Sequence, residues 1–301
     1  MTARRVSTTV LLALLLGACA PQPQRGPVEV DAQRSPQAPA TALPNRPDSL
    51  KFGVLGDFGN GSSAQMETAA EFARVHQRFP FSLVITVGDN IYGSERPQDF
   101  ARKFEMPYKP LLDAGVKFYA SLGNHDSDEQ RYYKLFNMEG KAYYSFKGDK
   151  QSVKFIALNS TYPEPEQIAW LQKELEDSRE DWKIPYFHHP PYSSGSRHGS
   201  QIDLRSVLEP LFVKHNVSVV FTGHDHTYER VKPQQGIVYF VAGSGGQLRS
   251  GGLDRNTGIT AVANASDRVF MVCEISGDEL FFNAISRTGQ IIDSGVITRR
   301  K

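Results

Sequence analysis

Apolar, β-favouring runs alternate with segments of helical periodicity along most of the chain. The runs predict strands at residues 51–56, 82–88, 116–123, 143–147, 153–159, 182–188 and 217–223. The helical pattern predicts helices at residues 64–79, 88 to about 114, 126–136, 165–178 and 204–215. Short continuous apolar runs are typical of strands buried on both faces. Their alternation with helices predicts an α/β domain.

From residue 236 to its end the domain becomes rich in strands. Apolar runs recur at residues 237–242, 268–275, 279–285 and 291–297 with no helical pattern between them. We find no internal repeat and no second boundary, so residues 50–301 are predicted to form one domain. The single cysteine of this domain, Cys273, lies in an apolar run and is predicted to be a buried thiol without a disulfide partner.

The first nineteen residues have the layout of an export signal. A basic start with Arg4 and Arg5 precedes an apolar run at residues 10–16 that is too short to cross a bilayer. Residues 16–19, Leu-Gly-Ala-Cys, resemble the lipobox of bacterial lipoproteins, in which cleavage leaves the cysteine lipidated. Ordinary cleavage after Ala20 is the alternative, because Ala18-Cys19-Ala20 also fits the small-x-small pattern.

Residues 20–49 are rich in Pro, Gln, Ala and Arg and hold almost no large apolar side chains. Such a segment cannot bury enough surface to offset its ordering entropy, so it is predicted to be a disordered tether. Together with lipidation at Cys19, this predicts an exported, membrane-anchored protein facing the periplasm or the cell exterior. The net charge of +1 predicts no nucleic-acid partner, so attraction for an anionic substrate must be local.

Polar side chains that can bind metals follow the carboxyl ends of five predicted strands. In an open α/β sheet, ligands bind in the crevice outside those strand ends. The five segments are Gly56-Asp57-Phe58-Gly59, Gly88-Asp89-Asn90-Ile91-Tyr92, Gly123-Asn124-His125-Asp126, His188-His189-Pro190 and Gly223-His224-Asp225-His226. Each segment alone fits a turn or a helix cap. Their joint occurrence at strand ends predicts a metal site.

These five motifs resemble the signature of the calcineurin-like metallophosphoesterases. That family usually has Asp-x-His in its first motif, whereas this chain has Asp57-Phe58-Gly59 and lacks the histidine. The purple acid phosphatase branch shows the same loss and has a tyrosine three residues after the second aspartate, where this chain has Tyr92. Glu229-Arg230 after Tyr228 also resembles that branch. The resemblance implies a four-layer α-β-β-α sandwich of two mixed sheets.

The resemblance also implies a ligand set for two metal ions. Asp57, Asp89, Tyr92 and His226 would hold one ion, and Asp89, Asn124, His188 and His224 would hold the other, with Asp89 bridging. The His-x-Pro pattern selects His188 as the ligand, not His189. Carboxylate and phenolate favour Fe(III), and imidazole and amide suit a divalent neighbour such as Fe, Zn or Mn.

Three further residues are expected to take part in catalysis. A metal-bound hydroxide would attack phosphorus in line, and His125 would stabilise the transition state or protonate the leaving group. Asp126 is expected to orient His125. His198, ten residues after His188, stands near the position of a catalytic His-Gly pair in the animal purple phosphatases.

The expected function is hydrolysis of phosphate monoesters of small molecules, as in acid phosphatases. One alternative is a phosphodiesterase that acts on nucleotides or lipid head groups with the same metals. The other is a tethered surface protein that binds metals without catalysis. Complete ligand positions favour an enzyme over this last alternative, because a vestigial site would be expected to have lost some of them.

Overall fold

The computed structural model describes residues 41–301. The predicted export signal, Cys19 and most of the predicted tether lie outside the described residues. Residues 41–49, the end of the predicted tether, are bound to the domain. Two backbone N–H groups, those of Asn45 and Arg46, donate to the two carboxylate oxygens of buried Glu274 at 2.7 Å each. Among the described residues, no helix combines the length and apolar character needed to cross a bilayer.

The first sheet has six strands, of which three carry predicted ligands at their carboxyl ends. Its order is β13-β12-β11-β1-β2-β3, with β1, β2 and β3 parallel and the other pairs antiparallel. The strands are β1 (Leu50–Leu55), β2 (Leu83–Val87), β3 (Lys117–Ser121), β11 (Val269–Ser276), β12 (Glu279–Ser286) and β13 (Ile291–Thr298).

The second sheet has seven strands in the order β10-β8-β9-β7-β6-β5-β4. Strands β5, β6, β7 and β9 are parallel, and β4, β8 and β10 pair antiparallel with their neighbours. The strands are β4 (Tyr144–Lys147), β5 (Val153–Ala157), β6 (Trp182–Tyr186), β7 (Val219–Thr222), β8 (Tyr228–Val231), β9 (Val238–Ala242) and β10 (Thr260–Asn264). Both sheets are therefore mixed.

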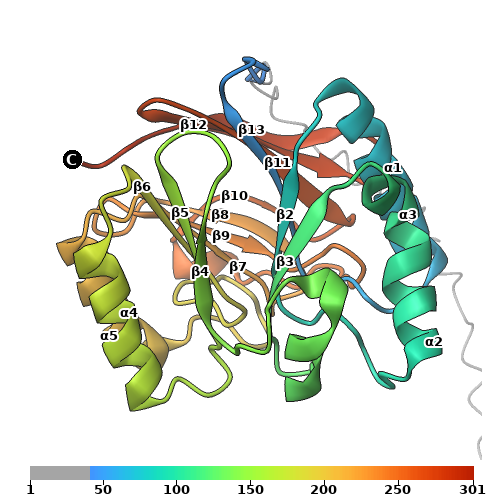
Figure 1. Ribbon diagram of the computed structural model, residues 1–301, viewed down its shortest axis with the longest axis horizontal. Coiled ribbons are helices and arrows are strands. Elements are labelled where there is room, and N and C mark those ends of the chain that lie inside the picture. Colours follow the sequence, from blue (N-terminus) through green and yellow to red (C-terminus); the bar gives the residue numbers. More distant parts are fainter. Residues whose placement is uncertain (1–40) are drawn as a thin grey trace, which may run out of the picture. The chain divides into compact units, whose positions relative to one another are not determined.

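Helices cover the outer face of each sheet, which confirms the predicted four-layer sandwich (Figure 1). One group consists of α1 (Ser63–Arg78), α2 (Pro97–Phe100), the π-helix η1 (Ala101–Glu105) and α3 (Met106–Asp113). The other consists of α4 (Pro165–Asp177) and α5 (Ile202–Lys214). Helix α1 packs on the first sheet through Phe72, whose ring lies 4.5 Å from that of Phe270. The predicted helix at residues 126–136 is instead two 3-10 turns, η2 (Asp128–Tyr132) and η3 (Lys134–Phe136), separated by extended backbone at Tyr133.

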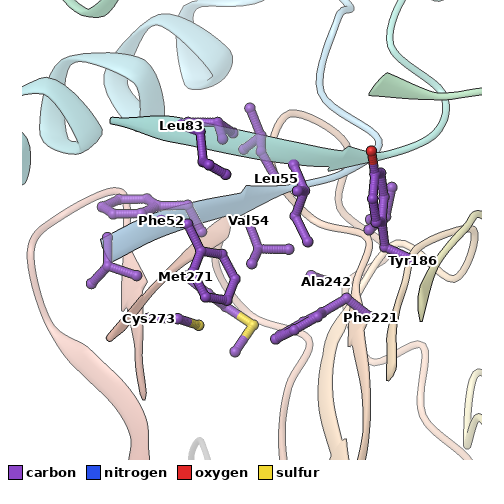
Figure 2. Close-up of a cluster of buried hydrophobic side chains, with 14 of the residues drawn as sticks. Phe52, Val54, Leu55, Leu83, Tyr186, Phe221, Ala242, Met271 and Cys273 are labelled. Atoms are coloured by element: carbon purple, nitrogen blue, oxygen red, sulfur yellow. The ribbon is translucent and has the colours of Figure 1, made fainter. Parts of the chain in front are cut away.

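The main core lies between the two sheets and is built from aromatic side chains of both. The Phe52 ring of β1 lies 5.2 Å from Phe155 of β5 and 6.0 Å from Phe221 of β7, both edge-on. Figure 2 shows Phe52, Val54 and Met271 of the first sheet facing Phe221 of the second. Cys273 is a buried free thiol in this core, as predicted. This packing brings the carboxyl ends of strands from both sheets to one edge.

Candidate metal centre

The seven predicted metal ligands converge at the edge where the two sheets meet. Loops after β1, β2 and β3 carry Asp57, Asp89, Tyr92 and Asn124, and loops after β6 and β7 carry the three histidines. Every element that delivers a ligand is thus a buried parallel strand that ends at the same place. The convergence follows from topology, because carboxyl ends of parallel strands share one edge.

The first cluster surrounds the hydroxyl of Tyr92. Its Oη lies 2.9 Å from Asp89 Oδ2, 3.2 Å from Asp57 Oδ1 and 3.1 Å from His226 Nε2. His226 Nε2 also lies 3.5 Å from Asp57 Oδ1. The four side chains predicted to share one ion therefore present one donor atom each to a common point.

The second cluster surrounds Nε2 of His188. This atom lies 3.0 Å from Asn124 Oδ1, 3.1 Å from His224 Nδ1 and 3.3 Å from Asp89 Oδ1. Asp89 therefore offers one carboxylate oxygen to each cluster, which is the arrangement expected of a bridging ligand. His188 Nδ1 faces the carbonyl of Val87 at 2.9 Å. A proton on Nδ1 would leave Nε2 free to bind a metal.

The spacing of these atoms fits two metal ions. Two donors about 2.1 Å from one ion, at right angles, lie about 3.0 Å apart. The donor distances in both clusters are 2.9 to 3.5 Å. The mixture of carboxylate, phenol, amide and imidazole donors also fits a pair of unlike ions.

The electrostatics of the site also call for cations. Burial and the nearby charge of Asp89 raise the pKa of Asp57 well above its usual value. Burial and the two aspartates likewise raise the pKa of Tyr92, so a phenolate at this position needs a highly charged ion beside it. Burial lowers the pKa of His188 strongly, and burial with the neighbouring histidines lowers that of His224 to about 2. Both imidazoles are therefore neutral and suited to ligation.

Three ligand residues have left-handed backbone conformations that are uncommon for residues other than glycine. Their φ angles are 53° at Asp57, 51° at Asp89 and 71° at His224. Each such residue costs of the order of 1–3 kcal/mol and persists only where its surroundings enforce it. Here the enforcement includes the N–H of His224, which donates to Asp57 Oδ2 at 3.0 Å. The N–H of His125 donates to Asp89 Oδ1 at the same distance.

Glycines allow the ligand loops to touch one another. A Cβ at Gly123 would lie 2.2 Å from Asp89 Oδ1, and one at Gly223 would lie 2.4 Å from Asp57 Oδ2. A Cβ at Gly88 would lie 2.6 Å from His188 Nδ1. Each of these glycines thus contacts a ligand from another loop at a distance that a side chain would not permit.

The two histidines expected to act in catalysis each lie beside a different cluster. The exposed His125 ring lies 5.0 Å from the ring of Tyr92, beside the first cluster. The exposed His198 ring lies 4.2 Å from the ring of His224, beside the second. Both are accessible to a substrate that bridges the two clusters.

Asp126 has a different place from the one expected. Its carboxylate accepts hydrogen bonds from the N–H groups of Asn90, Ile91 and Gly123, and from the side chains of Asn90 and Gln130. These contacts join the loop after β2 to the loop after β3. Asp126 therefore holds the ligand loops together, and among the described residues its carboxylate forms no hydrogen bond with the His125 ring. The sequence around Asp126 gave no sign of this role, because its partners in the loop after β2, Asn90 and Ile91, lie 36 and 35 residues away.

His189 is brought to the site although the sequence pattern favoured His188 as the ligand. A donor atom of His189 lies within 4.8 Å of donor atoms of His188 and His224. Its Nδ1 lies 3.0 Å from Ser160 Oγ, and its ring lies 4.4 Å from that of His224. Its place three residues after the end of β6, next to His188, was the available signal.

Comparison with known proteins agrees with this geometry. The chain is 27% identical over 238 residues to tartrate-resistant acid phosphatase type 5 of Oryctolagus cuniculus, covering 65% of this chain and 73% of that protein. It is 25% identical over 237 residues to purple acid phosphatase 4 of Arabidopsis thaliana, covering 67% and 70%.

Two solved structures share the fold. GAP50, described as the anchor in the inner membrane complex of Plasmodium, matches with a TM-score of 0.74 and 20% identity over 84% of this chain and 90% of that one. Purple acid phosphatase PPD1 of yellow lupin (Lupinus luteus) matches with a TM-score of 0.73 and 18% identity over 86% and 55%.

A family model described as calcineurin-like phosphoesterase matches residues 50–228, more than half of the chain. This segment contains all seven predicted ligands. The predicted enzyme class, a metal-dependent phosphoric ester hydrolase, is confirmed, and a dimetal centre is implied by the acid phosphatase relatives. The chain belongs to the calcineurin-like phosphoesterase family.

Proposed function

We propose that the chain is an acid phosphatase of the purple type that hydrolyses phosphate monoesters of small molecules. The observation that carries this proposal is the position of Tyr92. Its hydroxyl lies within 3.2 Å of both aspartates and of His226, where it completes a donor set from which the usual Asp-x-His histidine is missing. The similarity to tartrate-resistant and purple acid phosphatases supports the same assignment.

The proposed metals are Fe(III) in the first cluster and a divalent Fe, Zn or Mn in the second. Asp57, Asp89, Tyr92 and His226 would hold the first, and Asn124, His188 and His224 would hold the second with Asp89. When bound, the two ions would supply Lewis acidity and a hydroxide nucleophile at neutral pH. Aspartates and phenolate leave part of the metal charge uncompensated, so a nearly neutral protein attracts a phosphate dianion locally.

The chain's own residues would orient the ester and donate a proton to the leaving oxygen. The exposed His125, beside the first cluster, and the exposed His198, beside the second, would each contact a phosphate that bridges the two clusters. An imidazolium at either position would stabilise negative charge on the phosphoryl oxygens or protonate the leaving oxygen. Asp126 would keep the loops of Asp89 and Asn124 at a fixed separation.

The test is hydrolysis of nitrophenyl phosphate and bis-nitrophenyl phosphate, side by side, by protein purified without chelator. We expect a strong preference for the monoester. Preference for the diester would replace the proposal with a phosphodiesterase. Inactivity on both after metal reconstitution would favour a metal-binding surface protein. The likeness to the Plasmodium anchor protein concerns the fold alone and does not support that alternative.

We also propose that the protein is exported and anchored to a membrane through lipidated Cys19. The support is the sequence pattern Leu16-Gly17-Ala18-Cys19 after a short apolar run. Cys19→Ser should release the protein from the membrane fraction into the soluble fraction. Wild-type protein that is already soluble outside the cytoplasm would contradict the anchor and leave cleavage after Ala20 as the alternative.

A further inference from the structure

The segment that carries His198 is fastened to the domain by two carboxylates that no ligand assignment uses. We call residues 193–200, which follow β6, the His198 loop. Asp225 lies between His224 and His226, and Glu229 lies in β8. Their exposed fractions are 2% and 0%. Neither forms an ion pair with a basic side chain in the part of the chain that the structure describes.

Asp225 holds the His198 loop on both sides of the histidine. Its Oδ2 accepts a hydrogen bond from the hydroxyl of Ser193 at 2.6 Å and from the N–H of Gly199 at 3.1 Å. Ser193 Oγ in turn accepts from the N–H of Gly195 at 2.9 Å. The loop touches the carboxylate so closely that a Cβ on Gly195 would lie 2.0 Å from Asp225 Cγ. The loop is thereby closed into a turn with His198 at its tip.

Glu229 holds the base of the same loop. Its Oε2 accepts from the N–H of Ser194 at 2.7 Å, and its Oε1 accepts from the hydroxyl of Thr260 in β10 at 2.6 Å. The hydroxyls of Ser194 and Thr260 lie 2.7 Å apart and complete the cluster. Oε2 therefore joins the loop to β8, and Oε1 holds Thr260, whose hydroxyl contacts the loop in turn.

Burying a carboxylate without a cation is costly, so such groups are found where their hydrogen bonds are needed. The neighbouring Arg230 illustrates the contrast. Its guanidinium pairs with Asp293 of β13 in an ordinary ion pair, with Nε 2.7 Å from Oδ2. Glu229 and Asp225 have no such partner, and their oxygens accept hydrogen bonds from backbone N–H groups and a hydroxyl of the His198 loop and from the hydroxyl of Thr260.

We propose that Asp225 and Glu229 are positioning residues that keep the His198 ring against His224. This inference rests on the proposed function, in which His198 contacts the phosphate ester. Four hydrogen bonds fix the loop in one conformation beside the site. Two go to Asp225, one goes to Glu229, and one joins Ser194 to the hydroxyl of Thr260. They also give the Tyr228-Glu229-Arg230 segment a physical role, because its acidic residue fixes the loop.

The activity test is a double-mutant cycle on the full-length, metal-loaded protein. Asp225→Ala should lower kcat/KM for nitrophenyl phosphate about 10-fold, and His198→Ala should lower it about 100-fold. In the His198→Ala background, Asp225→Ala should cost less than about 2-fold, because it acts through the same side chain. Asp225→Asn, which keeps an acceptor oxygen, should restore most of the activity. Additive losses, or loss of bound metal in Asp225→Ala, would overturn the proposal.

Gly195→Ala perturbs the same contact from the loop side and leaves the ligand-bearing segment 224–226 unchanged. Gly195→Ala should lower kcat/KM by about as much as Asp225→Ala does, should have little effect in the His198→Ala background, and should keep its bound metal. The matched control is Asp278→Ala, which removes a surface carboxylate that pairs with Arg299 and Lys301 and should leave kcat/KM unchanged. Wild-type activity in Gly195→Ala would count against the proposal, since the loop would then tolerate separation from Asp225.

A second test does not depend on activity. Arg197 is exposed next to His198, so trypsin cleavage after Arg197 reports release of the loop. We expect cleavage at this bond to accelerate at least about 10-fold in Asp225→Ala and in Glu229→Ala, while cleavage elsewhere stays unchanged. Unchanged cleavage would refute the positioning role. If the wild type hydrolyses no phosphate ester, the proposed function fails, and this cleavage ratio still decides whether the two carboxylates hold the loop.

Discussion

The substitution Gly123→Ala tests whether the closeness of the ligand loops is required for function. Gly123 has no left-handed backbone, so alanine is compatible with its torsion angles and the effect is purely one of contact. Its Cβ would lie 2.2 Å from Asp89 Oδ1 and 2.3 Å from the backbone nitrogen of Asp89. Ordinary contact begins at 3.4 Å. The carboxylate and the loop must therefore separate by about 1.2 Å.

Asp89 cannot absorb this movement without losing a cluster. Its two oxygens lie 2.9 Å from Tyr92 Oη and 3.3 Å from His188 Nε2, so a shift of this size misaligns at least one metal site. A misplacement of about 1 Å typically costs about 100-fold in rate, or about 2.7 kcal/mol of transition-state stabilisation. We expect kcat/KM for nitrophenyl phosphate to fall by this factor, with a reduced metal content measured by elemental analysis.

The control for this prediction is Gly295→Ala in β13. Its Cβ would meet only the ring of Phe282, at 3.0 Å, and a side chain adjusts more easily than backbone. This variant should keep its activity with a small loss of stability. Gly123→Ala with wild-type kcat/KM and a full metal complement would refute the reasoning. Equal losses in both variants would show a general effect of added bulk.

Three further predictions follow from the site and from the contacts between the sheets. Tyr92→Phe should abolish the visible phenolate-to-iron absorption band of the iron-loaded protein, and a colourless wild type that is fully active with Zn or Mn alone would reject Fe(III) at Tyr92. Asp293→Ala should lower the free energy of unfolding by about 3 kcal/mol in urea titrations, because it leaves Arg230 and the buried hydroxyl of Tyr228 without their partner; a loss below about 1 kcal/mol would show that water replaces the carboxylate. Removal of metal by chelation should abolish activity and lower Tm, since ions at 100 times their Kd contribute about 2.7 kcal/mol; an unchanged Tm would show that the empty site is equally stable.

The architecture was largely predictable because buried parallel strands have a strong hydrophobic signal. The strands that deliver the ligands were predicted within two residues of their observed ends. Strands β8 and β10 were missed. Strand β8 is only four residues long and contains Glu229 and Arg230, whose partners lie in the His198 loop, β10 and β13. A strand whose charged side chains are paired with distant residues lacks the apolar pattern from which strands are predicted.

The site was predictable in its ligand positions and unpredictable in its supporting contacts. Motifs at strand ends reveal which side chains reach the edge, because topology brings those ends together. The role of Asp126 depended on loops that no local pattern connects. Asp225 was visible only as the unspecified residue of a Gly-His-x-His motif. Hydrogen bonds between distant loops leave no periodic pattern in a sequence, so they are seen only in the three-dimensional structure.

The division of the proposed ligands between the two sheets has a consequence for biosynthesis. Residues 57–124 would supply the carboxylates, the phenol and the amide, and residues 188–226 would supply the imidazoles, so each ion would join both halves of the chain. The second ion would lack a full donor set until His224 has been synthesised, and the first until His226 has, with β7 docked beside β6 in both cases. With these ligands, metal loading would be a late step that follows folding of the sandwich. Each ion then ties together segments that are far apart in the chain, as a cross-link closing a long loop does.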